Sequence, residues 1–185
     1  MQKFSKSILR TIVTTIVVAL GTLLATAQQN AKGYPRDVPQ AIAVPAGLEL
    51  TLSAHASGSQ IYTCKAGQDG KFAWTLKAPD AELRDGNNKV IGQHFVGPAW
   101  KLNDGSEVTG KAAGKVDSPD AGSIPWLLVN VVSHAGTGVL TKVTTIQRLH
   151  THGGKPPAAG CDAAHKDAET KSSYTADYYF YAPKS

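Results

Sequence analysis

The feature that most constrains the fold is an alternation of apolar and polar residues with a period of two. It begins at residues 48–54 and returns at 143–150. Such alternation predicts half-buried β-strands, because successive side chains of a strand point to opposite faces. Turn-forming residues such as those at 67–70 separate the alternating segments, and residues 28–185 contain no stretch with convincing helical periodicity and caps.

The remaining strands are predicted from shorter patterns between turn signals. They are expected at 61–65, 72–77, 89–95, 100–102, around 108, 126–132 and 174–181, with loops at 110–123 and 152–172. The apolar run 126–132 is expected to be covered on both faces, and the last strand carries aromatic residues on both faces. About eight or nine short strands predict an all-β domain, either a sandwich or a closed barrel, whose pairing order stays open.

The N-terminal residues 1–27 have the three parts of a cleaved signal peptide. Three basic residues come first, an apolar stretch follows at 12–24, and the segment ends in Ala25-Thr26-Ala27, a small-x-small cleavage pattern. The apolar stretch is short for a transmembrane helix, which needs about 20 apolar residues. An uncleaved anchor is the alternative. We therefore expect a secreted or periplasmic protein with no membrane span after cleavage.

Removal of the signal peptide changes both the domain plan and the charge. Residues 28–43 are polar with two prolines and are expected to be a flexible leader, and residues 44–185 are expected to form one β domain. Three of the 19 basic residues and none of the 14 acidic residues lie in 1–27, so the net charge falls from +5 to +2. Because no basic stripe is visible either, nucleic acid is not expected as a partner.

The two cysteines, Cys64 and Cys161, both lie in the exported part. In an oxidising compartment an even pair is most simply one disulfide, which would close a loop of about 97 residues. The chain-entropy model gives such a loop a stabilisation on the order of 4–5 kcal/mol. A metal or redox pair is the alternative, although the chain has no C-x-x-C motif and neither cysteine lies in a zinc-like cluster.

Motifs spread over residues 43–182 resemble a family of secreted bacterial and fungal proteins, the domain of unknown function 3455 family. The motifs occur in this order: Pro45-x-Gly47, Gln60-x-Tyr62-x-Cys64, Trp74, Ala81-x-Leu83, Gly92 to Trp100, Asp104-Gly105-Ser106-x-Val108, Ile124 to Leu128, Gln147-Arg148-x-x-Thr151-x-Gly153-Gly154, Cys161 and Tyr174-x-Ala176-x-Tyr178-x-Phe180-Tyr181. Each motif is weak alone, but the ordered set is specific. The resemblance implies one exported domain with a Cys64–Cys161 pair, and it brings no activity.

The candidate ligand site is centred on His94 and Trp100, in a segment bounded by Gly and Pro, with Asp104, Ser106 and Glu107 nearby in the sequence. An imidazole in an aromatic pocket can bind a small molecule or a sugar. We therefore expect a non-catalytic binding or structural module. The alternative is a secreted hydrolase that uses His94 with Asp104 or Glu107 as an acid/base pair. A purely structural histidine is the third interpretation.

The other chemical motifs are weak or absent. His150 and His152 would share one face of a strand and are weak metal-ligand candidates, whereas solvated histidines at a strand end are the favoured interpretation. The chain has no G-x-S-x-G elbow and no G-x-G-x-x-G after a strand, so no catalytic residue is assigned and no cofactor is expected. The identity of a ligand and the oligomeric state are not given by the sequence.

Overall fold

The computed structural model describes residues 33–184. The signal peptide expected at 1–27 and the first residues of the expected leader lie outside the described residues. Residues 33–184 contain β-strands, turns and three short 3-10 helices, and none of these helices is long and apolar enough to cross a membrane. The all-β fold class is therefore confirmed.

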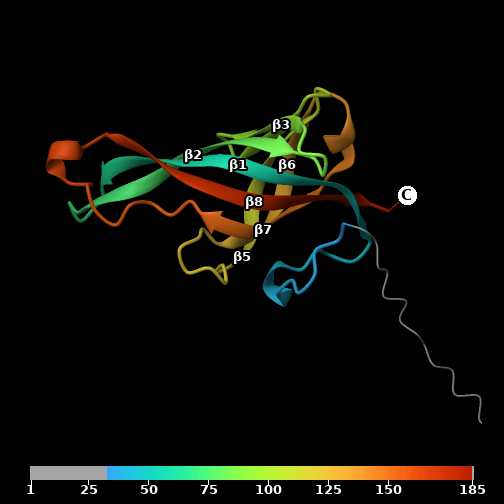
Figure 1. Ribbon diagram of the computed structural model, residues 1–185, viewed down its shortest axis with the longest axis horizontal. Helices are drawn as coiled ribbons and strands as arrows, with labels where there is room; N and C mark the ends of the chain where they lie inside the picture. The colour runs from blue at the N-terminus through green and yellow to red at the C-terminus, as the bar shows by residue number, and fades with distance from the viewer. Residues whose placement is uncertain (1–32, 185) are drawn as a thin grey trace, which may run out of the picture. The chain divides into compact units, whose positions relative to one another are not determined.

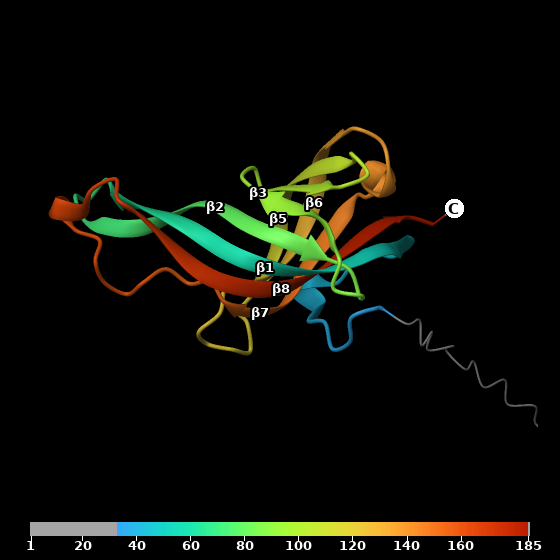
Figure 2. The same cartoon turned by 45° about the horizontal axis from the view of Figure 1, so that its top comes forward.

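Eight strands make up the sheet. They are β1 (Leu48–Ala66), β2 (Phe72–Arg84), β3 (Val90–Phe95), β4 (Ala99–Leu102), β5 (Glu107–Val116), β6 (Trp126–Ala135), β7 (Thr145–Gly153) and β8 (Glu169–Pro183). The 3-10 helices are η1 (Gln40–Ile42), η2 (Val139–Lys142) and η3 (Ala163–His165). Each strand pairs antiparallel with the next, and β8 pairs with β1, so the sheet closes into an up-and-down barrel. Of the two architectures expected, the closed barrel is the one that forms (Figures 1 and 2).

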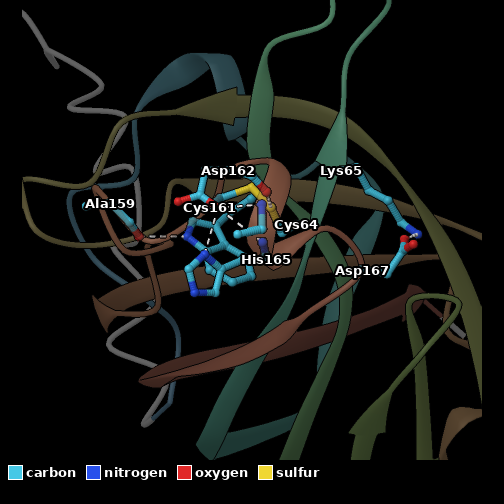
Figure 3. The surroundings of a disulfide bond; sticks show 9 residues. Cys64, Lys65, Ala159, Cys161, Asp162, His165 and Asp167 are labelled. Carbon is cyan, nitrogen blue, oxygen red and sulfur yellow. Dashed lines mark hydrogen bonds and ion pairs between the residues drawn. A yellow bond between two sulfur atoms is a disulfide. The ribbon is translucent and has the colours of Figure 1, made fainter.

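The strands β1, β2 and β8 are much longer than the others. Their distal ends run together past β3 to β7, toward the left of Figures 1 and 2. The expected disulfide between Cys64 and Cys161 forms there and joins β1 to the β7–β8 loop across 97 residues (Figure 3). Lys65 on β1 adds an ion pair with Asp167 at 2.6 Å. The long loop is therefore fixed to the end of the extension.

The barrel interior is filled from alternate positions of each strand. Register places the small residues of β1 opposite the aromatic residues of β8: Ala54 pairs with Tyr178 and Gly58 pairs with Tyr174. Gly58 also lies against β2, where an added Cβ would come within 2.2 Å of the Asp80 carbonyl oxygen. Small side chains on one wall thus leave room for large rings from the other.

Two loop and burial predictions are wrong. The segment 110–123 was expected to be a loop, but residues up to Val116 belong to β5. Its glycines are needed for close packing, since an added Cβ at Gly110 would lie 2.4 Å from Val129 Cγ1. The run 126–132 was expected to be covered on both faces, yet Val132 is 63% exposed, because a barrel wall has only one inner face.

The segment before the barrel is packed and partly ordered into η1. Ile42 is fully buried, and its carbonyl oxygen accepts a hydrogen bond from Gln147 Nε2 at 2.7 Å. Tyr34 lies against Tyr181, with ring centroids 6.3 Å apart, so the outer aromatic face of β8 is covered here. The packed body thus begins before residue 44, where the sequence placed the start of the domain.

Candidate functional site

The barrel interior contains a cavity of about 400 Å³. It is lined by residues of β1 to β8, namely Gln60, Leu76, Lys77, Ala78, Pro79, His94, Val96, Gly97, Pro98, Trp100, Ala112, Leu127, Val129, Arg148 and Tyr178. The cavity opens because β2 pairs with β3 only up to the Ala81–His94 pair. Residues 76–79 of β2 continue without β3 beside them, which leaves a gap in the wall next to the β3–β4 turn.

His94 lies in the wall of this cavity, as the sequence suggested. It pairs with Trp100 across β3 and β4, and the two rings stack with centroids 4.4 Å apart and an interplanar angle of 8°. Its Nδ1 lies 2.8 Å from the Ala99 carbonyl oxygen. Because a carbonyl only accepts, Nδ1 carries the proton. His94 is 3% exposed, and burial lowers its pKa from 6.5 to about 3, so the ring is neutral near pH 7.

Several polar atoms around the cavity have no hydrogen-bond partner. Among residues 33–184, five buried side-chain nitrogen or oxygen atoms lack one: Gln60 Nε2, Trp100 Nε1, Trp126 Nε1, Tyr174 Oη and Tyr178 Oη. Gln60, Trp100 and Tyr178 line the cavity. An unpaired buried donor or acceptor costs about 1–3 kcal/mol, so three such groups around one cavity need a physical explanation.

Arg148 adds a positive charge to the cavity wall. It lies on β7 and pairs in register with Tyr178 on β8 and Leu127 on β6. Its Nε and Nη2 atoms both donate to the Pro125 carbonyl oxygen, at 3.2 and 2.8 Å. Within residues 33–184 no carboxylate forms an ion pair with it.

The sequence did not single out Gln60, Arg148 or Tyr178 as site residues. Gln60 shares the inward register of Ala54 and Gly58, and Arg148 shares that of the barrel-facing residues of β7. A polar residue in an otherwise apolar alternation was the signal available. That signal can be recognised only when the inward face of each strand is known, and the inward face is fixed by the strand pairing.

The acidic part of the predicted site lies elsewhere. Asp104 is in the β4–β5 turn, and its carboxylate accepts hydrogen bonds from the Ser106 backbone N–H at 2.9 Å, the Ser106 hydroxyl at 2.6 Å and the Val139 N–H at 2.8 Å. These hydrogen bonds lower the pKa of the Asp104 carboxyl, and the bond from the Ser106 hydroxyl has the largest effect. The Ser106 hydroxyl in turn accepts from the Leu140 N–H at 3.2 Å. Glu107 pairs with Lys101 at 3.5 Å.

The structure therefore brings His94 and Trp100 together but does not bring Asp104 or Glu107 to them. His94 and Asp104 lie toward opposite ends of the short strand β4, and the hydrogen bond of His94 is to backbone. The acid/base pair required by the hydrolase hypothesis does not form among the described residues. Trp100 is only 2% exposed, so its ring does not offer a face for sugar stacking either.

His150 and His152 do not converge on a common point. His150 Nδ1 contacts Asp177 Oδ2 at 2.9 Å, and the other oxygen of Asp177 contacts His55 Nδ1 at 2.9 Å. His152 faces a different carboxylate, that of Asp120, at 3.7 Å. No group of three or more His, Cys, Asp or Glu residues that could hold a metal ion exists within residues 33–184.

Comparison with known families agrees with the ordered motifs of the sequence. The family model DUF3455, described as a protein of unknown function, matches residues 45–182. The chain belongs to this family. No curated protein and no solved structure matches the chain. The DUF3455 match includes every residue that lines the cavity, so the candidate site lies within the family domain.

Proposed function

We propose that this DUF3455 domain is an exported, non-catalytic binding protein that holds one small molecule in the barrel cavity. The observation that supports this most strongly is the set of unpartnered polar atoms on Gln60, Trp100 and Tyr178. These side chains are buried and all line the same cavity. A ligand with matching polar groups would satisfy them, which explains why the chain retains groups that lower its own stability.

The cavity has the dimensions and lining of a ligand site. Its volume of about 400 Å³ falls within the range of roughly 300–1,000 Å³ found for small-molecule pockets. Most of its lining is apolar, with a few polar groups among the apolar residues, which is the usual composition of such sites. The disulfide between Cys64 and Cys161 supports an oxidising compartment, in line with export.

Two neighbouring alanines allow a matched test of the cavity. Both are exposed, but Ala112 lines the cavity and Ala113 lies outside the lining. We expect the disulfide-bonded protein to bind the neutral fluorophore N-phenyl-1-naphthylamine with a stoichiometry of one. Ala112→Phe should weaken this binding by about tenfold or more because it fills the entrance, a loss of roughly 1.4 kcal/mol. Ala113→Phe should bind as the unmodified protein does.

Fluorescence titration measures both affinities, and urea unfolding checks that the two variants are equally folded. Equal binding by Ala112→Phe and Ala113→Phe would place the fluorophore outside the cavity and contradict the proposal. Absence of binding by the unmodified protein would contradict it as well.

A further inference from the structure

The charge and the hydrogen-bonding capacity of the cavity point to one class of ligand. Arg148 contributes a guanidinium group that has five N–H donors and no acceptor. Its Nε and Nη2 both donate to the Pro125 carbonyl oxygen, and the guanidinium also lies beside the Tyr178 hydroxyl. No carboxylate of residues 33–184 forms an ion pair that would neutralise its charge.

The unpartnered atoms of the side chains that line the cavity are mostly donors. Gln60 Nε2 and Trp100 Nε1 can only donate hydrogen bonds, and the Tyr178 hydroxyl can donate as well. Burial raises the pKa of Tyr178, whereas the neighbouring Arg148 and Tyr174 side chains act in the opposite direction. Arg148 therefore lies close to the aromatic wall, and an acceptor-rich anion would satisfy the whole group.

The mouth of the cavity is apolar. Leu76 is 52% exposed and Val96 is 61% exposed, and both line the cavity, as does the exposed Pro98. Exposed apolar side chains beside a cavity favour an occupant with an apolar body. The second cation in the lining, Lys77, is already paired with Glu169 at 2.5 Å. Arg148 is therefore the cation that remains for a ligand.

We infer that the ligand is a small amphiphilic carboxylate, with its carboxylate on Arg148, Tyr178 and Gln60 and its apolar body between Leu76 and Val96. This inference rests on the proposed function and specifies its ligand class. A cavity of about 150 Å³ holds benzene. The volume of about 400 Å³ therefore accommodates a carboxylate whose body is the size of one or two rings or a medium alkyl chain.

Three acid and amide pairs test the inference, because each amide keeps the shape of its acid and loses the charge. The pairs are benzoate with benzamide, 2-naphthoate with 2-naphthamide, and octanoate with octanamide. We expect at least one acid to bind about tenfold more tightly than its amide, the gain of one charge-assisted hydrogen bond. Calorimetric titration of the disulfide-bonded protein measures the affinities.

Substitution of two cations locates the origin of this preference. Arg148→Gln should lower the affinity for the acid by about tenfold and change that for the amide by less than about twofold. Lys171→Gln is the matched control, since Lys171 lies outside the cavity lining and its charge is paired with Asp80 at 3.2 Å, and this variant should keep the preference. Binding of N-phenyl-1-naphthylamine checks that each variant retains the cavity. If Arg148→Gln does not fold, the comparison of acids with amides on the unmodified protein still tests whether the cavity prefers a carboxylate.

The outcomes separate the two proposals. If the neutral fluorophore binds in the cavity but no acid binds more tightly than its amide, the carboxylate inference is wrong and the binding function stands. An acid preference that survives Arg148→Gln also overturns the inference. If the fluorophore, the acids and the amides all fail to bind, the proposed function itself is wrong.

Discussion

The two ends of the site, the cavity and the β4–β5 turn, differ in whether their polar groups have hydrogen-bond partners within the protein. Around the β4–β5 turn, the Asp104 carboxylate accepts three hydrogen bonds, and the fully buried Ser106 hydroxyl both donates and accepts. Val139 and Leu140, at the start of η2, supply two of the donors. This network fixes η2 to the turn, and its polar groups are paired within the protein.

Around the cavity, the polar groups on Gln60, Trp100 and Tyr178 are as buried as Ser106 but unpartnered. Native proteins pair almost all buried polar groups, so a local failure to do so has a specific cause. Paired groups contribute to stability, whereas unpartnered groups around a cavity lower stability and remain available to a ligand. The β4–β5 turn is therefore the part of the site that stabilises the fold, and the cavity is the part available for binding.

The largest expected effect concerns the pH dependence of stability at the cavity end. The pKa of His94 is about 3 in the folded protein, against 6.5 for an ordinary histidine. Between these values the unfolded chain binds a proton at this residue and the folded chain does not. The contribution of the neutral His94 to the free energy of unfolding is therefore present above about pH 6.5. It is lost as the pH falls toward the folded-state pKa, by about 1.4 kcal/mol per pH unit.

Replacement by a ring that does not titrate measures this contribution. His94→Phe keeps an aromatic ring against Trp100 and removes the titrating group. Urea unfolding at pH 7.5 and pH 4.5 should show an additional loss of about 3 kcal/mol in the unmodified protein relative to His94→Phe. Parallel pH profiles would mean that His94 is accessible to protons in the folded state, contrary to its burial.

The next effect tests the paired end. Ser106→Ala removes a hydroxyl that bridges the Asp104 carboxylate and the Leu140 N–H, leaving a buried donor unpaired. We expect a loss of about 2 kcal/mol in the free energy of unfolding, measured with urea. Binding of N-phenyl-1-naphthylamine should not change. A variant that keeps its stability but loses binding would reverse the roles assigned to the two ends.

Much of the fold could be predicted from residue patterns, because strand alternation and turn chemistry are local. The class, the approximate number of strands and the disulfide pair all followed from such patterns. The choice of a closed barrel did not, since closure depends on the pairing of β8 with β1. The strand at 110–116 was missed because Gly110 and Gly114 resemble loop residues until their close neighbours are known.

The candidate site was predicted only in part. His94 and Trp100 were found because they are near each other in the sequence and are direct partners in register. Asp104 was included for the same reason, but the four residues of β4 place it toward the other end of the strand from His94. Gln60, Arg148 and Tyr178 come from three distant strands, and only barrel closure brings them to one cavity.

The smallest expected effect is also the one that most directly distinguishes the two ends. Tyr178→Phe removes an unpartnered hydroxyl from a fully buried ring and leaves the ring in place. If this hydroxyl serves a ligand, its loss should stabilise the free protein by about 1 kcal/mol in urea unfolding, because no buried polar group then lacks a partner at this position. The same substitution should weaken binding of the preferred acid by about fivefold or more. Loss of stability together with unchanged binding would instead mean that the Tyr178 hydroxyl is paired within the protein, as the Ser106 hydroxyl is at the other end. A substitution that raises the stability of the free protein and weakens ligand binding is expected only where a polar group serves a ligand. No substitution in the Asp104 network should have this pair of effects.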